Sequence, residues 1–403
     1  MSAGASGGPP DSAAAFGAAP TVRQELVASA KELALEVVSK HAADVDRRGR
    51  FPQESVDALR KARLLGCAVP EELGGLGATL PELSAICTTL GEQCATTAMV
   101  FAMHQIQVLC IVRHAGNSQL LRGYLRECAE KQLLIASATS ELGVGGDIRT
   151  SLCSVEESGG RFTLNKEASV ISYGEYTDDV LVTARRSPDA APSDQVLVLV
   201  RRAETKLEKK GEWDTLGMRG TCSLGFMLRA EGDIGQILPA PFAEISAQTM
   251  HPVSHIVWTS AWLGIATSAV SIARKYVRAE ARKKPGVLPP SALRAAELVN
   301  QLHGMRAIVK DAMHEYGVRY HDPDALEGLG FQIRMNNLKI SISEQVVPVV
   351  QKALSICGIS GYRNDTPYAL GRQLRDAYGA GVMILNDRLY GTNAKLLLVS
   401  KED

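Results

Sequence analysis

The chain has 403 residues, which is long for a single hydrophobic core and favours two or three packed units. Hydrophobic residues make up 45% and charged residues 22%, as in ordinary globular proteins, and 44 basic side chains balance 44 acidic ones. The resulting formal net charge of zero excludes proteins that bind nucleic acid or anionic membranes through bulk charge, so we expect no nucleic-acid partner.

The N-terminal segment, MSAGASGGPPDSAAAFGAAP, is rich in small residues and has no basic region followed by an apolar core. We therefore expect residues 1–21 to be a disordered leader and not a signal peptide. The eight cysteines form no CxxC pair and no metal-ligand spacing, which predicts free thiols, no metal site and a cytoplasmic chain. No uninterrupted apolar run approaches the roughly eighteen residues of a transmembrane helix, so no membrane span is expected.

Residues 22–133 have the apolar spacing of helices and are expected to form an N-terminal helical domain. QELVASAKELALEVVSKHAADVDRRG and FPQESVDALRKARLLG carry apolar residues three or four positions apart. The later segment LSAICTTLGEQCATTAMVFAMHQIQVLCIVRHAG is apolar on nearly every side, which predicts a buried helix pair.

Residues 134–242 change to short runs rich in Val, Thr and Leu that alternate with polar residues. The runs are RFTLNKEASVIS, DDVLVTARRS, DQVLVLVRRA and SLGFMLRAEG. This alternation is typical of half-buried strands and predicts a small antiparallel β-barrel or sandwich domain.

Residues 243–403 return to a helical period and predict a C-terminal helical bundle of four helices. The fold class expected from the whole chain is α+β, with helices, then strands, then helices. The four helical segments are IVWTSAWLGIATSAVSIARKYVRAEARKK, ALRAAELVNQLHGMRAIVKDAMHEYG, FQIRMNNLKISISEQVVPVVQKALSICG and RQLRDAYGAGVMILNDRLYGTNAKLLLVS.

A glycine-rich loop, SATSELGVGGDIRTS, begins at residue 137 between an apolar run and the next strand. It lacks the GK[ST] ending of a Walker loop, and no βαβ unit surrounds it, so it is not a nucleotide phosphate loop of either common kind. By itself the pattern also suits a plain glycine-rich turn.

Five short matches, in this order within a helix–strand–helix chain, resemble the acyl-CoA dehydrogenase superfamily of flavoproteins over roughly residues 22–400. They are SELGVGGD at residues 140–147, against the family's Thr-Glu-Pro-Gly-x-Gly-Ser-Asp; LNKEASVIS at 164–172, against Leu-Asn-Gly-x-Lys-x-Trp-Ile-Thr; LGMRGT at 216–221, against Leu-Gly-x-Arg-x-Ser/Thr; Arg282 before Gly286, against Arg-x-x-Phe-Gly; and CGISGY at 357–362 followed by LRDA at 374–377, against Gly-Gly-x-Gly-Tyr and Arg-Asp-Ala.

The resemblance implies FAD as cofactor and assigns it a set of residues. Small residues let backbone approach a flat ring, and short hydroxyls or amides can hydrogen-bond its heteroatoms. The family's arginine reaches the FAD pyrophosphate of a neighbouring subunit, which implies a homodimer or homotetramer. The assigned residues are Thr139, Ser140, Gly145 and Gly146 in the loop, Ile171 and Ser172 beside the flavin, Arg282 at the pyrophosphate, Gly358 beside the adenosine half, and Asn386 at the family's threonine.

This sequence departs from the family where the catalytic glutamate is expected. Counting without a gap from Arg-Asp-Ala places Ile384 at one family position. If Tyr390-Gly391-Thr392 is aligned with the family's Tyr-Glu-Gly-Thr instead, the glutamate is skipped altogether. The other family position, on the first bundle helix, holds Ser254. Asp387 is the nearest acidic residue and His255 the nearest other proton acceptor, so both are candidate catalytic residues. The competing interpretation gives Asp387 a helix-capping role and His255 a role at a helix entry.

Three functions remain open at this point. The first is FAD-dependent oxidation of the CH–CH bond of an acyl-CoA or acyl-carrier-protein thioester, with an electron-accepting flavoprotein or oxygen as electron acceptor and an atypical or absent base. The second is a flavin-dependent monooxygenase of the same fold, which does not need the glutamate. The third is an inactive partner subunit of a heteromeric dehydrogenase, which the replacements Val170 and Ser355 also favour.

Overall fold

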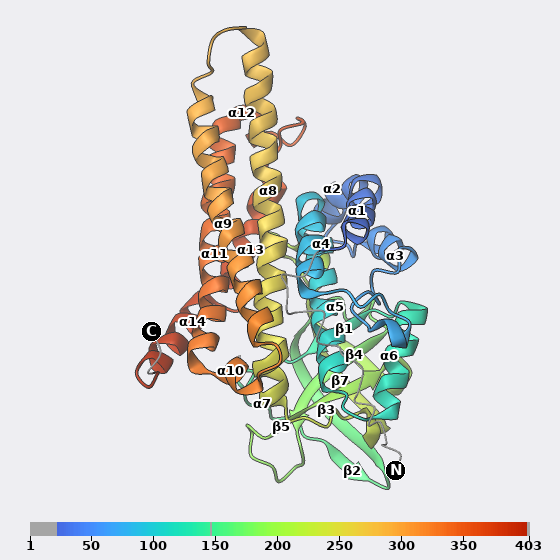
Figure 1. The fold of residues 1–403 in the computed structure, drawn as a ribbon. Helices are drawn as coiled ribbons and strands as arrows, with labels where there is room; N and C mark the ends of the chain where they lie inside the picture. Colours follow the sequence, from blue (N-terminus) through green and yellow to red (C-terminus); the bar gives the residue numbers. More distant parts are fainter. Residues whose placement is uncertain (1–21, 146, 401–403) are drawn as a thin grey trace, which may run out of the picture.

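Helices, strands and helices follow one another along residues 22–145 and 147–400, the parts of the chain that the computed structural model describes (Figure 1). This order confirms the expected α+β fold class. The leader predicted at residues 1–21 lies outside the described residues, and the proposed domain boundaries remain an interpretation.

Six α-helices form the N-terminal part and confirm its helical character. The predicted buried pair is α4 and α5, both of which are largely buried because their apolar residues extend around most of the helix. A π-helical turn, Ala34–Val38, joins α1 to α2, and a 3₁₀ turn, Glu71–Leu73, precedes α4. The α-helices are α1 Gln24–Leu33, α2 Ser39–Arg48, α3 Gln53–Lys61, α4 Leu80–Gln93, α5 Ala95–His114 and α6 Gln119–Lys131.

Two helical stretches, Ala95–His114 and Phe242–Lys283, are long and apolar enough to cross a membrane by length and composition alone. Of their most apolar windows, 83% and 72% respectively are buried inside the fold. Such burial is typical of core helices in a globular protein.

The strands form two separate sheets, so the β region is not a closed barrel. A three-stranded sheet has the order β1-β4-β5, and a four-stranded sheet has the order β2-β3-β7-β6. All pairs are antiparallel except β1 with β4, which departs from the purely antiparallel expectation. The strands are β1 Ile135–Ala138, β2 Glu156–Ser158, β3 Arg161–Ile171, β4 Asp179–Arg185, β5 Gln195–Arg201, β6 Thr205–Lys210 and β7 Leu224–Asp233.

Burial differs between the two sheets. Along β3, buried and exposed residues alternate, as the sequence predicts for a half-buried strand. By contrast, β4 and β5 are buried at nearly every position and were wrongly expected to be half-buried. Helices α5 and α7 (Phe242–Ile245) pack against this sheet, and β3 and β7 also contact it, so both of its faces are covered.

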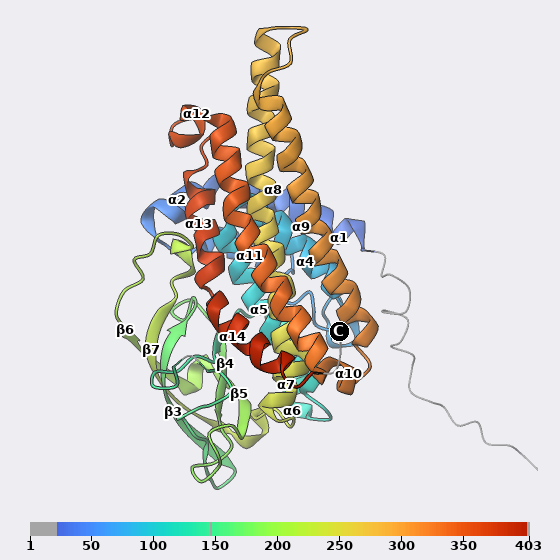
Figure 2. The same ribbon diagram turned by 90° about the vertical axis from the view of Figure 1, so that its left-hand side faces the viewer.

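The C-terminal bundle contains four long helices, α8 His251–Lys283, α9 Ser291–Arg319, α11 Leu329–Cys357 and α13 Gly371–Val382 (Figure 2). A π-helical turn, Ser246–Met250, leads into α8, and α10 Pro323–Glu327 and α12 Ile359–Tyr362 are short connecting helices. The last predicted helical segment is split in two, because the chain breaks at Ile384 (φ +49°) and α14 Asn386–Leu397 follows.

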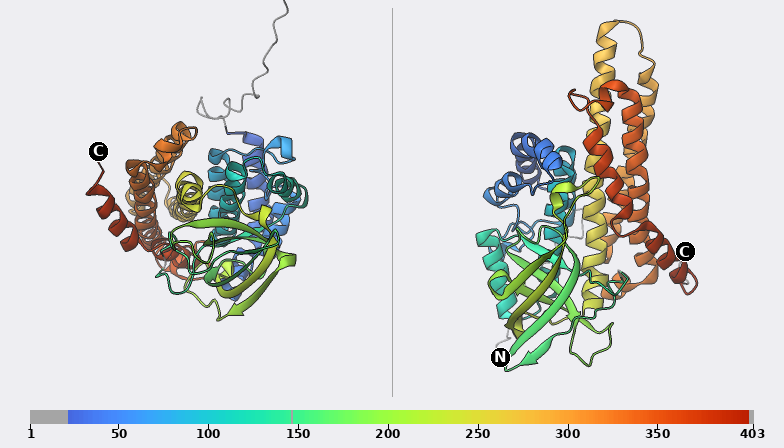
Figure 3. Two further views of the ribbon diagram at one scale, coloured as in Figure 1. Left: turned by 90° about the horizontal axis from the view of Figure 1, so that it is seen from below. Right: turned by 180° about the vertical axis from the view of Figure 1, so that it is seen from behind.

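Helix α8 joins the two helical regions. Figure 3 shows α8 (yellow) between the N-terminal helices and the other bundle helices. Its contact with α4 is close at two glycines. A Cβ atom added at Gly264 would lie 2.5 Å from the carbonyl oxygen of Thr88, and a Cβ atom added at Gly91 would lie 2.5 Å from the carbonyl oxygen of Ala261. Ser84 Oγ and Ser260 Oγ also meet across this contact at 2.7 Å. Both N-terminal and bundle elements therefore fix the position of α8.

Candidate functional site

A buried carboxylate anchors the glycine-rich loop at its start. Glu141 Oε2 accepts hydrogen bonds from Ser151 Oγ at 2.6 Å and the Leu152 amide at 3.1 Å, and Glu141 Oε1 accepts one from the Cys153 amide at 2.8 Å. These bonds connect the two ends of the loop, because Glu141 and Cys153 lie on opposite sides of it. Glu141 is 6% exposed, so solvent contributes little to holding the loop.

Lys166 on β3 pairs with this carboxylate inside the β region. Its Nζ lies 3.2 Å from Glu141 Oε2 and donates to the Thr183 carbonyl oxygen on β4 at 2.8 Å. Burial raises the pKa of Glu141, but the charge of Lys166 and the hydrogen bonds outweigh that effect and hold the pKa below its ordinary value. Glu141 is therefore ionised at neutral pH, and the pair joins the loop to both sheets.

The hydroxyl of Ser140 is used by the backbone of β3. Ser140 Oγ donates to the Val170 carbonyl oxygen at 3.0 Å and accepts from the Val170 amide at 3.1 Å. The hydroxyl of Thr139 makes no hydrogen bond within the part of the chain that the structure describes, so it is available to a ligand. Ser140 is thus placed to shape the site, and Thr139 to contact what binds there.

The loop exposes backbone amides. Gly143 (φ +92°) and Gly145 (φ +60°) have left-handed backbone conformations that favour glycine. Among the described residues, the amides of Gly143, Val144 and Gly145 donate to no backbone oxygen. Such free amides at successive positions are ready to donate to an acceptor atom of a ligand. Gly146, also predicted to bind the cofactor, lies outside the described residues.

Three exposed apolar side chains surround these amides. Leu142 is 52% exposed, Leu152 58% and Val170 38%, and a Cβ on Gly143 would meet Leu152 at 2.9 Å. Exposed aliphatic surface next to free amides and a hydroxyl suits a planar aromatic heterocycle, which has apolar faces and hydrogen-bonding edges. The described residues therefore fit the kind of ring that the resemblance implies.

Ile171 and Ser172 follow a bulge in β3, where the pairing with β7 shifts between Ala168 and Ile171. Ile171 is fully buried, whereas Ser172 is half-buried and its Oγ lies 2.8 Å from Ser223 Oγ. Thr221 Oγ1 lies a further 2.8 Å from Ser223 Oγ, so the three hydroxyls form a chain. The bulge changes the direction of β3 just before Ser172, whose hydroxyl is the one predicted to lie beside the flavin.

The C-terminal helix α14 meets the glycine loop. Arg388 Nη2 donates to the Gly145 carbonyl oxygen at 2.9 Å, which brings the expected base region and the loop together. Asp387 lies on the first turn of α14 with an exposed side chain. Its role as a base remains a prediction.

Sequence reasoning missed Lys339, a fully buried lysine on α11. Its Nζ donates to the Ile384 carbonyl oxygen and to Asn386 Oδ1, each at 2.7 Å. In the gap-free register Ile384 falls at the family's glutamate position, and the ammonium group of Lys339 contacts the backbone of that residue. The only signal in the sequence is one lysine in the otherwise uncharged run LKISIS.

His255 lies on α8 and faces α11. It is 1% exposed, and its Nδ1 lies 2.9 Å from the Met335 carbonyl oxygen, which can only accept, so Nδ1 carries the proton. Burial, helped by neighbouring His251, holds the pKa of His255 well below its ordinary value. The imidazole is therefore neutral at physiological pH, with Nε2 unprotonated.

Arg282 and Gly358 lie at the opposite end of the bundle from the glycine loop. Arg282 is exposed in the last turn of α8, at the end of the hairpin that α8 and α9 extend beyond the β region (Figure 1). Gly358 (φ +55°) is exposed between α11 and α12. One chain does not bring these two residues to the predicted ring site, and their roles at a cofactor shared between subunits remain predictions.

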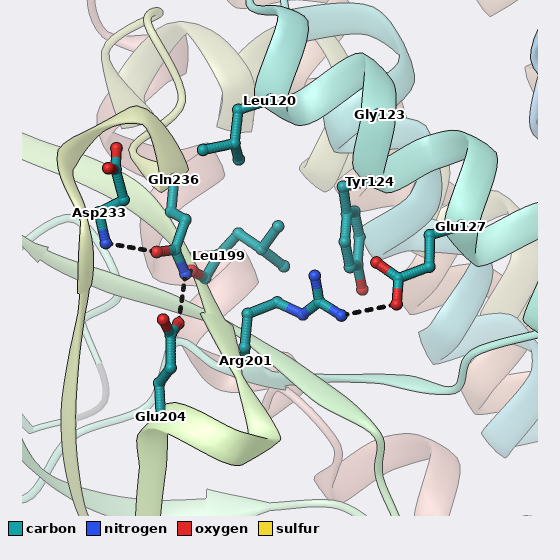
Figure 4. A pocket seen from close by; sticks show the side chains of 9 residues that line it. All are labelled: Leu120, Gly123, Tyr124, Glu127, Leu199, Arg201, Glu204, Asp233 and Gln236. Carbon is teal, nitrogen blue, oxygen red and sulfur yellow. Dashed lines mark hydrogen bonds and ion pairs between the residues drawn. The ribbon is translucent and has the colours of Figure 1, made fainter.

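A surface cavity of about 370 Å³ lies elsewhere, between α6, β5 and the turn after β7 (Figure 4). Several of its polar groups bond to one another, since Arg201 Nη2 donates to Glu127 Oε1 at 3.0 Å and Gln236 Nε2 donates to Glu204 Oε2 at 3.0 Å. None of its lining residues belongs to the predicted site, and its polar groups leave no clear role for a ligand.

Two family models match the chain. Residues 21–132 match the family described as acyl-CoA dehydrogenase, N-terminal domain, and residues 247–383 match acyl-CoA dehydrogenase, C-terminal domain.

Two curated relatives and one solved structure illustrate the range of similar proteins. Cyclohex-1-ene-1-carbonyl-CoA dehydrogenase of Syntrophus aciditrophicus is 23% identical over 87% of this chain and 84% of its own. L-evernosamine nitrososynthase of a Micromonospora species is 28% identical over 86% of this chain and 83% of its own. FMN-bound TdsC, the dibenzothiophene monooxygenase of Paenibacillus sp. A11-2, shares the fold with a TM-score of 0.81. It is 20% identical, and the match covers 93% of this chain and 97% of TdsC.

Proposed function

Because the chain belongs to the acyl-CoA dehydrogenase family, whose members are flavin-dependent oxidoreductases, we propose that it is a flavin-dependent monooxygenase and not a thioester dehydrogenase. One observation carries the proposal: the glutamate position holds Ile384, and the group behind it is the buried cation Lys339. Dehydrogenase and monooxygenase-type names both occur among the relatives, so family membership alone does not decide between them.

Thioester dehydrogenation needs a carboxylate that removes the α-proton of the substrate. At the first family position, the Ile384 side chain cannot accept a proton. At the second, Ser254 Oγ donates to the Met250 carbonyl oxygen within its own helix. Asp387, the remaining candidate, has a solvent-exposed side chain and is not enclosed with a substrate.

The residues of the β region support binding of a flavin ring. Glu141 and Lys166 hold the loop, the amides from Gly143 to Gly145 and the Thr139 hydroxyl provide donors, and Leu142 and Val170 provide apolar contact. A bound flavin supplies two-electron redox chemistry and, once reduced, reaction with oxygen. The protein's own part is to orient the ring and to place the substrate beside it.

The proposal is tested by giving the purified protein FAD, NADH and a flavin reductase. We expect oxygen uptake that depends on the protein, and no anaerobic bleaching of the flavin by butyryl-CoA or a butyryl carrier protein. Anaerobic bleaching by either thioester overturns the proposal in favour of a dehydrogenase.

The third function predicted from the sequence, an inactive partner subunit, has a different signature in the same preparation. Flavin that cannot be loaded into the purified chain alone, together with co-purification of a second chain of similar length, contradicts the monooxygenase proposal and supports that function.

A further inference from the structure

An internal polar cluster lies between α8, α11 and the start of α14. We define it as His251, His255, Trp258, Lys339 and Asn386. The ring centroids of His251 and His255 are 4.4 Å apart, and those of His255 and Trp258 are 6.0 Å apart. Lys339 Nζ lies 5.8 Å from the centroid of Trp262, one helical turn beyond Trp258 on the same face of α8.

Lys339 is a buried cation that forms no ion pair within the described residues, and the nearest opposing charge, Glu344, acts on it without direct contact. It is 0% exposed, and no carboxylate in residues 22–145 or 147–400 forms an ion pair with it. Its two hydrogen-bond acceptors, the Ile384 carbonyl oxygen and Asn386 Oδ1, are neutral, and an ammonium group has a third hydrogen to donate. Burying such a charge is costly, which singles this position out as functional.

Two more polar atoms in the cluster are also unsatisfied. His251 Nδ1 and Trp258 Nε1 are buried and have no hydrogen-bond partner within the described part of the chain. His251 Nε2 is used, at 2.8 Å from Asn336 Oδ1. The indole Nε1 can only donate, so Lys339 and Trp258 each contribute a donor to the cluster.

Four residues at or beside the cluster are partly open to solvent. His251, Trp258, Ile384 and Asn386 are all partly exposed, in contrast to Lys339 behind them. Asn386 is two residues before Arg388, whose guanidinium contacts the Gly145 carbonyl oxygen. The cluster thus adjoins the surface at which we place the flavin ring.

We propose that this cluster binds a carboxylate of the substrate, with Lys339 as its counterion and Trp258 Nε1 as a second donor. The substrate class is accordingly an organic acid, or an acyl group that carries a free carboxylate. The inference rests on the proposed function in one respect, because it treats the cluster as part of the substrate site beside the flavin.

The charge state of the cluster suits an anion at neutral pH. Burial lowers the pKa of Lys339 to about 8, against the opposing charge of Glu344 on α11, so the ammonium form still dominates at pH 7. The neighbouring titratable groups are His251 and His255 on α8, whose pKa values burial lowers. With both imidazoles neutral, Lys339 is the single positive charge of the cluster. The carboxylate of Glu344 borders the cluster at Asn386, whose Nδ2 donates to Glu344 Oε1 at 3.4 Å.

The test uses tryptophan fluorescence of the full chain as purified, with hexanoate and its uncharged analogue hexanamide as probes. Two of the three tryptophans, Trp258 and Trp262, flank the cluster and report on it. We expect a saturable change with hexanoate and at least tenfold weaker binding of hexanamide. Lys339→Met should weaken hexanoate binding at least tenfold, and Lys352→Met, on the same helix but paired with Glu297, should leave it unchanged.

A pH series on the unaltered chain keeps the test decisive even if Lys339→Met does not fold. Hexanoate affinity should fall at least tenfold between pH 7 and 9.5 as Lys339 loses its proton, while hexanamide binding stays constant. Equal affinity for both probes, no saturable signal, or the same hexanoate affinity in Lys339→Met overturns the inference. The signal does not require flavin chemistry, so failure of the monooxygenase proposal is seen separately in the oxygen-uptake experiment.

Discussion

The guanidinium of Arg388 donates to the carbonyl oxygen of Gly145 at 2.9 Å and so joins positions 243 residues apart in the sequence. This contact brings the start of α14 against the glycine loop. It is the direct link between the residues that fit the flavin and the segment in which the family keeps its catalytic glutamate.

Arg388→Ala should weaken FAD binding about fivefold, since a charge-assisted hydrogen bond that is open to solvent contributes about 1 kcal/mol to the position of the loop. The measurement is a titration of flavin fluorescence against protein. Arg126→Ala, at an exposed arginine on α6, is the control and should change nothing. Equal affinities for all three proteins would mean that the contact does not shape the flavin site.

Glu141→Gln should destabilise the fold by about 3–5 kcal/mol, because it leaves the buried ammonium of Lys166 without its carboxylate. Urea unfolding followed by circular dichroism measures the loss. The double variant Glu141→Gln with Lys166→Met should recover much of it, because no unpaired charge then remains. The pKa of Glu141 is lowered in the folded protein. The stability that its carboxylate contributes is therefore present at neutral pH and is lost as the pH falls through this folded-state pKa.

Arg282→Ala should reduce FAD retention by about 1.5–3 kcal/mol if the arginine serves a cofactor in a neighbouring subunit. Flavin content after extensive dialysis gives the loss, and sizing chromatography at several concentrations gives the oligomeric state. Lys284→Ala in the same exposed basic run is the matched control. A monomer that retains flavin equally well in all variants would remove Arg282 from the site.

Asp387→Asn should leave flavin reduction and reoxidation rates within about twofold, because the side chain is exposed on the first turn of α14. A loss of about 10²–10⁴-fold would instead identify Asp387 as a general base. The informative companion is Ile384→Glu, which restores a carboxylate at the family position. Anaerobic bleaching by butyryl-CoA in that variant alone would show that only the base is missing.

The stability difference between the unaltered chain and Lys339→Met should depend on pH. The folded-state pKa of Lys339 is about 8, below the ordinary value of 10.5, so between these values the unfolded chain binds more protons and stability rises with pH. The quantity followed is the unfolding free energy of the unaltered chain minus that of Lys339→Met. We expect it to rise by on the order of 3 kcal/mol from pH 8 to 10.5, and to be constant below pH 7. A pH-independent difference from urea unfolding would place Lys339 in a more polar environment than the structure indicates.

Local patterns in the sequence were sufficient to predict much of the fold. Strand β3 follows from the alternation in RFTLNKEASVIS, and the buried helices α4 and α5 follow from their apolar circumference. The exposed glycine loop follows from its composition, since several of its positions need left-handed backbone.

The parts that were missed depend on long-range contacts or on breaks in an otherwise regular pattern. The helix that ends at Val382 continues into the apolar run VMIL, so only the positive φ of Ile384 reveals the break. A single lysine on a helix such as α11 gives no sign of whether it faces solvent or core, which is why Lys339 escaped notice. Glu141 and Lys166 are 25 residues apart, and nothing local predicts that they pair.

The open edges of the four-stranded sheet have a consequence for the behaviour of the protein in concentrated solution. An unpaired strand edge is a template on which another molecule can add a strand, and such addition leads to aggregation. Here β2 is only three residues long, and β6, with the sequence TKLEKK, presents Lys206, Glu208, Lys209 and Lys210 as exposed side chains. An approaching strand would have to remove water from these charges, so the edge resists intermolecular pairing.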